Sequence, residues 1–108
     1  MHSVYFIQAK PGGKQKGDRP VKIGYSKNPE KRAKELQTGN PNELVVIVSL
    51  PFESESEARE MEGTMHYLAR KKHQALMGEW FIIYGGWPNF IAACYKIFDG
   101  NKKNKKPY

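Results

Sequence analysis

The sequence predicts a small α+β domain in which helices flank a short antiparallel sheet. Segments rich in β-branched and aromatic residues, which favour strands, alternate with segments that carry helix-capping residues. The chain has 108 residues, 39% of them hydrophobic, which is enough for one compact core. We therefore expect a single domain over residues 1–98, followed by a basic, flexible tail over residues 99–108.

Four segments have the composition of strands. Ser3–Ala9 and Pro20–Gly24 are expected to form a hairpin whose connection, Lys10–Arg19, is long, basic and rich in glycine. The apolar run in Glu43–Leu50 predicts a strand buried on both faces, either at the centre of the sheet or beneath the helices. Glu79–Ile83 predicts a further strand.

Three segments have the signals of helices. Ser26 or Asn28 caps a first helix that has proline in its first turn and spans about residues 29–37. A Ser-x-x-Glu capping box opens a longer helix over residues 54–72. A last helix, opened by proline, is expected over residues 88–98.

The charge is positive and unevenly distributed. The formal net charge is +7, and residues 10–34 hold nine Lys or Arg against two acidic residues, whereas residues 53–62 hold five Glu and one Arg. A basic surface beside an acidic segment suits a protein that binds a phosphate backbone and holds a metal ion, although lysines on helices and tails are often only solvated. The candidate DNA contacts are Lys10, Lys14, Lys16, Arg19 and Lys27.

No membrane or secretion signal is evident in the sequence. The longest apolar run, Leu44–Leu50, is far shorter than the roughly 20 residues that span a bilayer. Cys94 stands alone in an apolar segment, which predicts a buried, reduced thiol. We therefore expect a soluble, cytoplasmic protein.

The long helix is expected to carry ionisable residues along one flank of its buried stripe. With Ala58 set at 0°, Glu62 falls at about 40° and His66 at about 80°, at 100° per residue. A carboxylate at the edge of a core needs a partner or a cation, so Glu62 is the leading metal-ligand candidate. The alternative is a salt bridge from Glu62 to Arg59 or His66.

The first helix gives a similar result for Arg32. With Pro29 at 0°, Arg32 lies at about −60°, beside the apolar positions Ala33 and Leu36. An inward guanidinium can offer a planar pair of donors to a phosphate. Arg32 is therefore a candidate for phosphate binding.

These residues occur in an order that resembles a known family. Val4-Tyr5-Phe6-Ile7 is followed by Lys22-Ile23-Gly24, Arg32, a Glu-x-x-x-His pair at positions 62 and 66, and Gly78-Glu79-Trp80-Phe81. The set resembles the GIY-YIG nuclease superfamily over about residues 3–83. The closer resemblance is to its divergent phage and microbial branch, which includes meiotically up-regulated gene product-like domains.

The resemblance implies a small three-stranded antiparallel sheet flanked by helices and one divalent metal, Mg²⁺ or Mn²⁺, held by Glu62. It also implies that Tyr5 orients or deprotonates the attacking water and that Arg32 stabilises the reacting phosphate. The implied activity is DNA endonuclease, acting on duplex DNA. A monomer with one such site is expected to nick one strand, whereas a double-strand cut needs a dimer or two binding events. The expected state is a monomer or weak homodimer, and a phage or mobile element is the expected origin.

The sequence departs from the superfamily pattern in three places. Lys22 stands where a second tyrosine is expected, and Leu36 stands where many members carry a histidine or tyrosine one turn after the helix arginine. The closing asparagine is also missing, and Glu79 stands near its place. Lys22 is either a catalytic cation that favours the Tyr5 phenolate or a strand lysine facing solvent; Glu79 can equally cap a strand edge. His66 is either a substitute base or a histidine at the edge of the core.

Two other functions fit the same features less fully. A catalytically inactive nucleic-acid-binding module would keep the fold and the basic loop, and a small protein inhibitor would need neither metal nor DNA. A zinc site from His66, His73 and Cys94 matches no familiar ligand spacing and lacks a fourth ligand.

Overall fold

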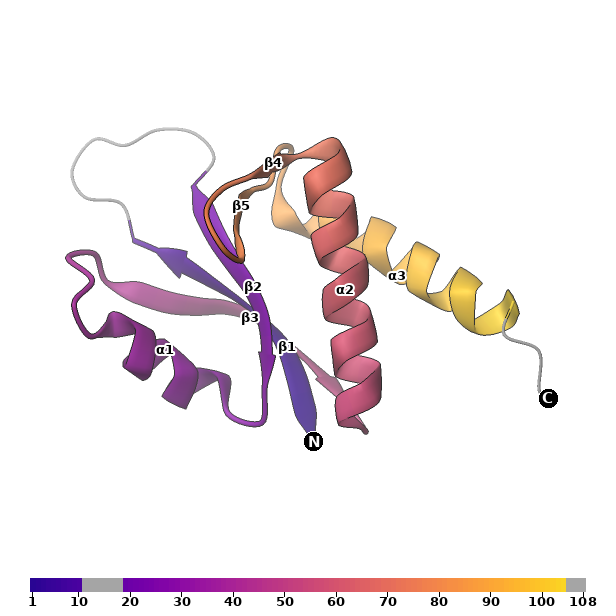
Figure 1. Cartoon of the computed structure of the whole chain (residues 1–108), viewed down its shortest axis with the longest axis horizontal. Helices are drawn as coiled ribbons and strands as arrows, with labels where there is room; N and C mark the ends of the chain where they lie inside the picture. The colour runs from indigo at the N-terminus through magenta and orange to yellow at the C-terminus, as the bar shows by residue number, and fades with distance from the viewer. Residues whose placement is uncertain (11–18, 105–108) are drawn as a thin grey trace.

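A five-stranded antiparallel sheet separates one helix on one face from two helices on the other (Figure 1). The computed structural model describes residues 1–10 and 19–104. The strands are β1 (His2–Ala9), β2 (Pro20–Ser26), β3 (Leu44–Phe52), β4 (Gln74–Ala75) and β5 (Trp80–Ile82). The helices are α1 (Pro29–Gln37), α2 (Glu55–Lys72) and α3 (Trp87–Asn104).

The α+β class is confirmed, but the sheet is larger than the resemblance implied. Its order is β3-β1-β2-β5-β4, so two short strands extend a three-stranded centre. The added strands form a hairpin closed by the backbone bond from Leu76 N to Trp80 O, at 2.8 Å. Because β5 pairs with β2 only at Pro20, Val21 and Lys22, it covers the first part of β2 and leaves the rest of that edge open.

The side chains of β1 alternate between two cores. Val4 and Phe6 point into the larger core beneath α2 and α3, while Tyr5 and Ile7 point into a smaller core beneath α1. This is the two-residue period of a strand buried on both faces. The central strand therefore fixes which side chains face α1 and which face α2.

The strand formed by the long apolar run is not at the centre of the sheet. β3 pairs only with β1, and its register shifts between Phe6 and Ile7. Leu44 and Val46 pack in the core beneath α1, whereas Leu50 and Phe52 belong to the core beneath α2 and α3. Of the two expected positions, the centre of the sheet is wrong and the position beneath the helices is right, because β3 is an edge strand that contributes to the cores on both faces.

The helix caps agree with the sequence signals, and the last helix is longer than expected. Asn28 caps α1 by accepting from Lys31 N at 3.1 Å, and Ser54 caps α2 by accepting from Glu57 N at 3.1 Å. α3 runs to Asn104, past the expected end at residue 98, so part of the expected tail is helical. Residues 105–108 of that tail lie outside the described residues.

Two further expectations concern Cys94 and the membrane. Cys94 is buried in the larger core, and burial raises the pKa of its thiol to about 12. None of the helices in the described residues is both long and apolar enough to cross a bilayer.

Gly24 makes room for the phenol of Tyr5. The two residues are direct partners in the β1–β2 ladder. A Cβ atom added at Gly24 would lie 2.6 Å from Tyr5 Cζ, well inside van der Waals contact. The glycine is therefore required by the tyrosine ring that lies across it.

We predict that Gly24→Ala destabilises the protein by about 1–3 kcal/mol, because the added methyl group meets a ring in a packed core. Urea unfolding would measure the change. The matched control is Gly63→Ala in α2, where nothing lies within 4 Å of the added Cβ and helix propensity favours alanine by about 1 kcal/mol. A Gly24→Ala variant as stable as the wild type would contradict this account of the contact.

Candidate active site

The open edge of β2 begins where its pairing with β5 ends. The last pair of the ladder is Lys22 with Trp80, and Ile23 N then donates to Glu79 O at 3.1 Å. Unpaired backbone groups at a strand edge need other partners when they are covered by protein. In this sheet, side chains of α2 supply them.

Glu62 and His66 bond the backbone of this edge. His66 Nε2 lies 2.8 Å from Ile23 O, and the carboxylate of Glu62 accepts a hydrogen bond from the backbone of Tyr25. Four residues along a helix rise about 6 Å, and two along a strand rise about 6.6 Å, so the two spacings match. The Glu-x-x-x-His pair therefore runs along β2 in register with alternate residues.

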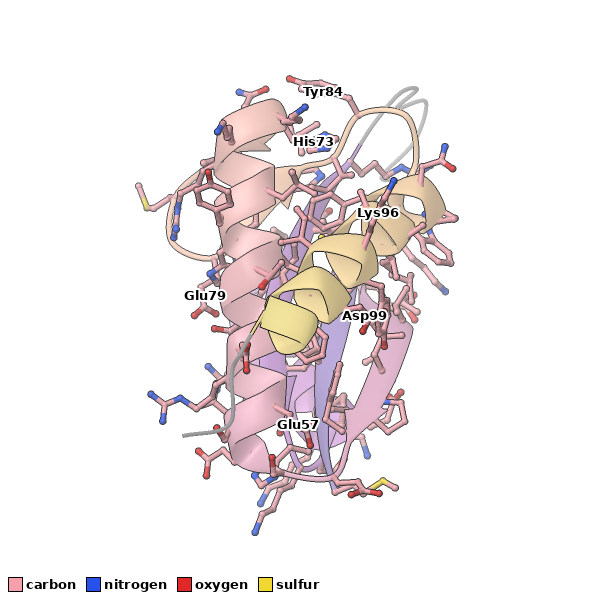
Figure 2. All side chains as sticks on the ribbon, turned by 90° about the vertical axis from the view of Figure 1, so that its right-hand side faces the viewer. Glu57, His73, Glu79, Tyr84, Lys96 and Asp99 are labelled. Atoms are coloured by element: carbon pink, nitrogen blue, oxygen red, sulfur yellow. The ribbon has the colours of Figure 1, made fainter. Side chains whose placement is uncertain are left out.

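Glu79 brings a second carboxylate to the same place. One ligand atom each from Glu62, His66 and Glu79 all lie within 4.8 Å of one another. Figure 2 shows Glu79 alongside the middle of α2, between Glu57 near the start of the helix and His73 beyond its end. Two oxygen ligands and one nitrogen ligand at this spacing could hold a metal ion.

Lys22 is held by Glu79 and does not point to solvent. Its Nζ atom lies 2.9 Å from Glu79 Oε2, and its side chain is 10% exposed. Of the two expectations for Lys22, the solvent-facing one is wrong. Its charge is paired with a carboxylate, which differs from the expected role as the cation beside Tyr5.

Arg32 is the cation that contacts Tyr5. The phenol of Tyr5 is hydrogen-bonded to the Arg32 side chain, which favours the phenolate. Burial has the larger effect and raises the pKa of Tyr5 above its usual value; the negative charges of Glu79 and Glu62 act in the same direction. The phenol thus has its counter-charge in place but remains protonated while both carboxylates are ionised.

Arg32 is more exposed than the helical wheel suggested. Its side chain is 45% exposed, and Nη1 also donates to Glu35 Oε2 at 3.1 Å. The guanidinium leaves the edge of the small core and reaches Tyr5 from the side that is open to solvent. It therefore remains accessible to a phosphate.

Glu62 is the most perturbed carboxyl among the described residues that titrate. Burial, followed by the charge of Glu79, raises its pKa from 4.5 to about 7, while Lys22, the Tyr25 backbone and Arg59 act in the opposite direction. No salt bridge joins Glu62 to Arg59 or His66 in the part of the chain that the structure describes. The predicted salt bridge is therefore absent, and the need for a cation at Glu62 stands.

The structure describes three of the five candidate DNA contacts. Lys10 is exposed and pairs with Glu43 at 3.2 Å. Arg19 is partly exposed, and its Nε atom is buried without a hydrogen-bond partner. Lys27 is exposed beside the start of α1, whereas Lys14 and Lys16 lie outside the described residues.

Two open pockets lie near these residues. The larger, of about 500 Å³, lies at the start of α2, where Glu55 and Glu60 outnumber Arg59 in the lining and make it less favourable for a phosphate. The smaller, of about 260 Å³, lies at the start of α1 and shares Arg32 with the Tyr5 contact. Its lining is Ser26, Lys27, Asn28, Lys31, Arg32 and Glu35. The smaller pocket is the better place for a nucleic-acid backbone to continue from Arg32.

The structure adds Glu79 to the residues expected from the sequence. From the sequence, Glu79 either stands near the place of the closing asparagine or caps a strand edge, and its backbone oxygen accepts from Ile23 N. Its side chain nevertheless turns to Lys22 and approaches Glu62. The signal in the sequence was an acidic residue at the start of a predicted strand. Only the three-dimensional structure shows that this residue lies beside α2 (Figure 2).

Comparison with known proteins gives one match. The family model described as the T5orf172 domain matches residues 2–99. No curated protein and no solved structure matches the chain. The matched segment includes the whole edge site, from Tyr5 to Glu79.

We predict that Glu62 lowers the stability of the metal-free protein as the pH rises. Below its usual pKa of 4.5, Glu62 is protonated in both the folded and the unfolded chain and has no effect. Between pH 4.5 and about 7 the unfolded chain releases this proton first, so folding stability falls and then levels off. Glu62→Gln should remove that loss.

Thermal unfolding in EDTA at pH 5 and pH 8 would test this sign. The variant should gain stability relative to the wild type at pH 8, with a smaller difference at pH 5. A difference that is constant with pH, or largest at pH 5, would contradict the raised pKa.

Proposed function

This chain belongs to the T5orf172 domain family, a nuclease-related family, and we propose that it is a metal-dependent DNA endonuclease of the GIY-YIG type. The observation that carries the proposal is the contact between the Tyr5 phenol and the Arg32 guanidinium, close enough to Glu62 for its charge to act on Tyr5. These three residues come from β1, α1 and α2. Their convergence supports a site in which Tyr5 would be the general base, Arg32 the anion-binding group and Glu62 the metal ligand.

Arg32 is the phosphate-binding group in this proposal. Its guanidinium is always charged and can stabilise the negative charge that builds on the phosphate during hydrolysis. Because the guanidinium is already hydrogen-bonded to Tyr5 and Glu35, little further ordering is needed when phosphate binds.

Tyr5 is the residue that orients the attacking water and takes its proton. A phenol is a poor base near neutral pH, and burial makes it poorer. Arg32 supplies the charge that stabilises the phenolate, and neutralising Glu62 and Glu79 would remove two charges that oppose it.

Glu62 holds the divalent metal, Mg²⁺ or Mn²⁺, in this proposal. The chemistry of the site fits such an ion, because two carboxylates lie close together at the edge of a buried surface. When bound, the ion supplies Lewis-acid stabilisation of the phosphate and of the leaving oxygen.

Duplex DNA is the proposed substrate, and the basic residues around Arg32 and the β1–β2 connection are its proposed contacts. Lys27 lies in the pocket that continues from Arg32, while Lys10 and Arg19 flank the connection that contains Lys14 and Lys16. One site cuts one strand, so a monomer would nick the duplex, whereas a double-strand cut would need a dimer or two binding events. A phage or mobile element is the proposed origin.

We predict that the protein nicks supercoiled plasmid with Mn²⁺ or Mg²⁺ and that Glu62→Gln, Arg32→Ala and Tyr5→Phe each lower the rate by about 100-fold or more. Each change removes one of the three groups that meet at the edge of β2. Gel electrophoresis of the plasmid would measure the rate. Glu30→Gln, an exposed carboxyl in the first turn of α1, is the matched control and should leave the rate unchanged.

Two results would contradict the proposal. Plasmid that stays intact with either metal but shifts in a gel would indicate a nucleic-acid-binding module without catalysis, which Lys22 in place of a tyrosine would favour. Plasmid that is neither cut nor bound would indicate a protein partner instead.

A further inference from the structure

We propose that the metal site of this chain is a three-residue site, in which Glu62, His66 and Glu79 together bind a divalent transition-metal ion in preference to Mg²⁺. The resemblance implied Glu62 alone, and nothing in the family match assigns the other two residues. The inference rests on the proposed nuclease function only for the role of the metal in cleavage. Its own basis is the meeting of three ligand atoms within 4.8 Å.

The histidine is oriented for this role by the backbone of β2. His66 is 8% exposed, and its Nε2 atom lies 2.8 Å from Ile23 O, an acceptor that fixes a proton on Nε2. The Nδ1 atom then carries the free lone pair and has no hydrogen bond among the described residues. Histidine ligands of metals commonly donate their second ring nitrogen to a backbone carbonyl in this way.

Glu79 is held at both ends. Its backbone oxygen accepts from Ile23 N at 3.1 Å, and its Oε2 atom accepts from Lys22 Nζ at 2.9 Å. The residue before it, Gly78, has φ +67°, which lets the hairpin turn so that Glu79 faces α2. The Lys22 ammonium uses one lone pair of Oε2, so Oε1 and the second lone pair of Oε2 are left for a metal.

The backbone of a single residue, Ile23, therefore positions two of the three ligands. Its N–H holds Glu79 and its carbonyl holds His66, while Tyr25, two residues on, holds Glu62. A ligand set fixed by strand backbone needs little rearrangement to bind an ion. This arrangement explains how side chains from α2 and from a hairpin loop come to share one site.

The donor set indicates the class of ion. Two carboxylates and one imidazole suit Mn²⁺, Fe²⁺ or Zn²⁺ better than Mg²⁺, which favours oxygen ligands and keeps several waters. Three protein ligands also leave coordination positions for water and a phosphate oxygen. Lys22 offsets part of the negative charge and so allows both carboxylates to remain close before an ion binds.

The test is to titrate the metal-free full chain with Mn²⁺. Calorimetry would measure the affinity and the number of ions bound, and pulsed electron paramagnetic resonance would detect a nitrogen ligand. The wild type should bind one Mn²⁺ ion and show coupling to a ¹⁴N nucleus. Glu79→Gln should weaken binding at least tenfold. His66→Gln should do the same, remove the nitrogen coupling and narrow the preference for Mn²⁺ over Mg²⁺.

Glu30→Gln serves as the control and should bind Mn²⁺ as the wild type does. Circular dichroism would show whether each variant is folded. If His66→Gln fails to fold, the nitrogen coupling of the wild type and the affinity of Glu79→Gln still decide the question. Mn²⁺ bound without nitrogen coupling, or bound equally well by Glu79→Gln, would overturn the three-residue site.

The two proposals fail in different ways. If the protein nicks plasmid while both variants keep full Mn²⁺ affinity, the ligand set is wrong and the nuclease proposal stands. If Mn²⁺ binds through all three residues but the plasmid stays intact, the metal site stands and the nuclease proposal fails.

Discussion

The site depends on how the backbone groups at the edge of β2 are hydrogen-bonded beyond Lys22, where pairing with β5 ends. β5 pairs as far as Lys22, and beyond it the backbone of Ile23 and Tyr25 is bonded by Glu79, His66 and Glu62. A longer β5 would satisfy the same backbone groups, but it would cover the edge with a strand. The short hairpin therefore makes room for polar side chains along the second part of β2.

This edge also sets the electrostatics of the site. Burial raises the pKa of both Glu62 and Tyr5; the charge of Glu79 adds to this effect at Glu62, and the charges of Glu79 and Glu62 add to it at Tyr5. Two cations act in the opposite direction. Lys22, which pairs with Glu79, lowers the pKa of Glu62, and Arg32 lowers the pKa of Tyr5. An added cation at the carboxylates would relieve the same repulsion, which is the physical reason to expect metal and phenol to be coupled.

Local signals in the sequence predicted the elements well, and long-range pairing explains what they missed. The caps Asn28 and Ser54 act over three residues, so their helices could be predicted from sequence. The position of β3 depends on pairing with β1, and hydrophobicity alone does not distinguish a central strand from an edge strand under two helices. Glu79 was missed as a site residue for the same reason, because its partner Lys22 is 57 residues away.

Crystals of the protein grown with Mn²⁺ and a short DNA duplex would test the central claim directly, through anomalous scattering at the manganese edge. The account predicts a peak bonded to Glu62 at the open edge of β2, with a DNA phosphate between the ion and the Tyr5–Arg32 pair. A peak elsewhere on the protein, or DNA bound to a surface away from this edge, would contradict it.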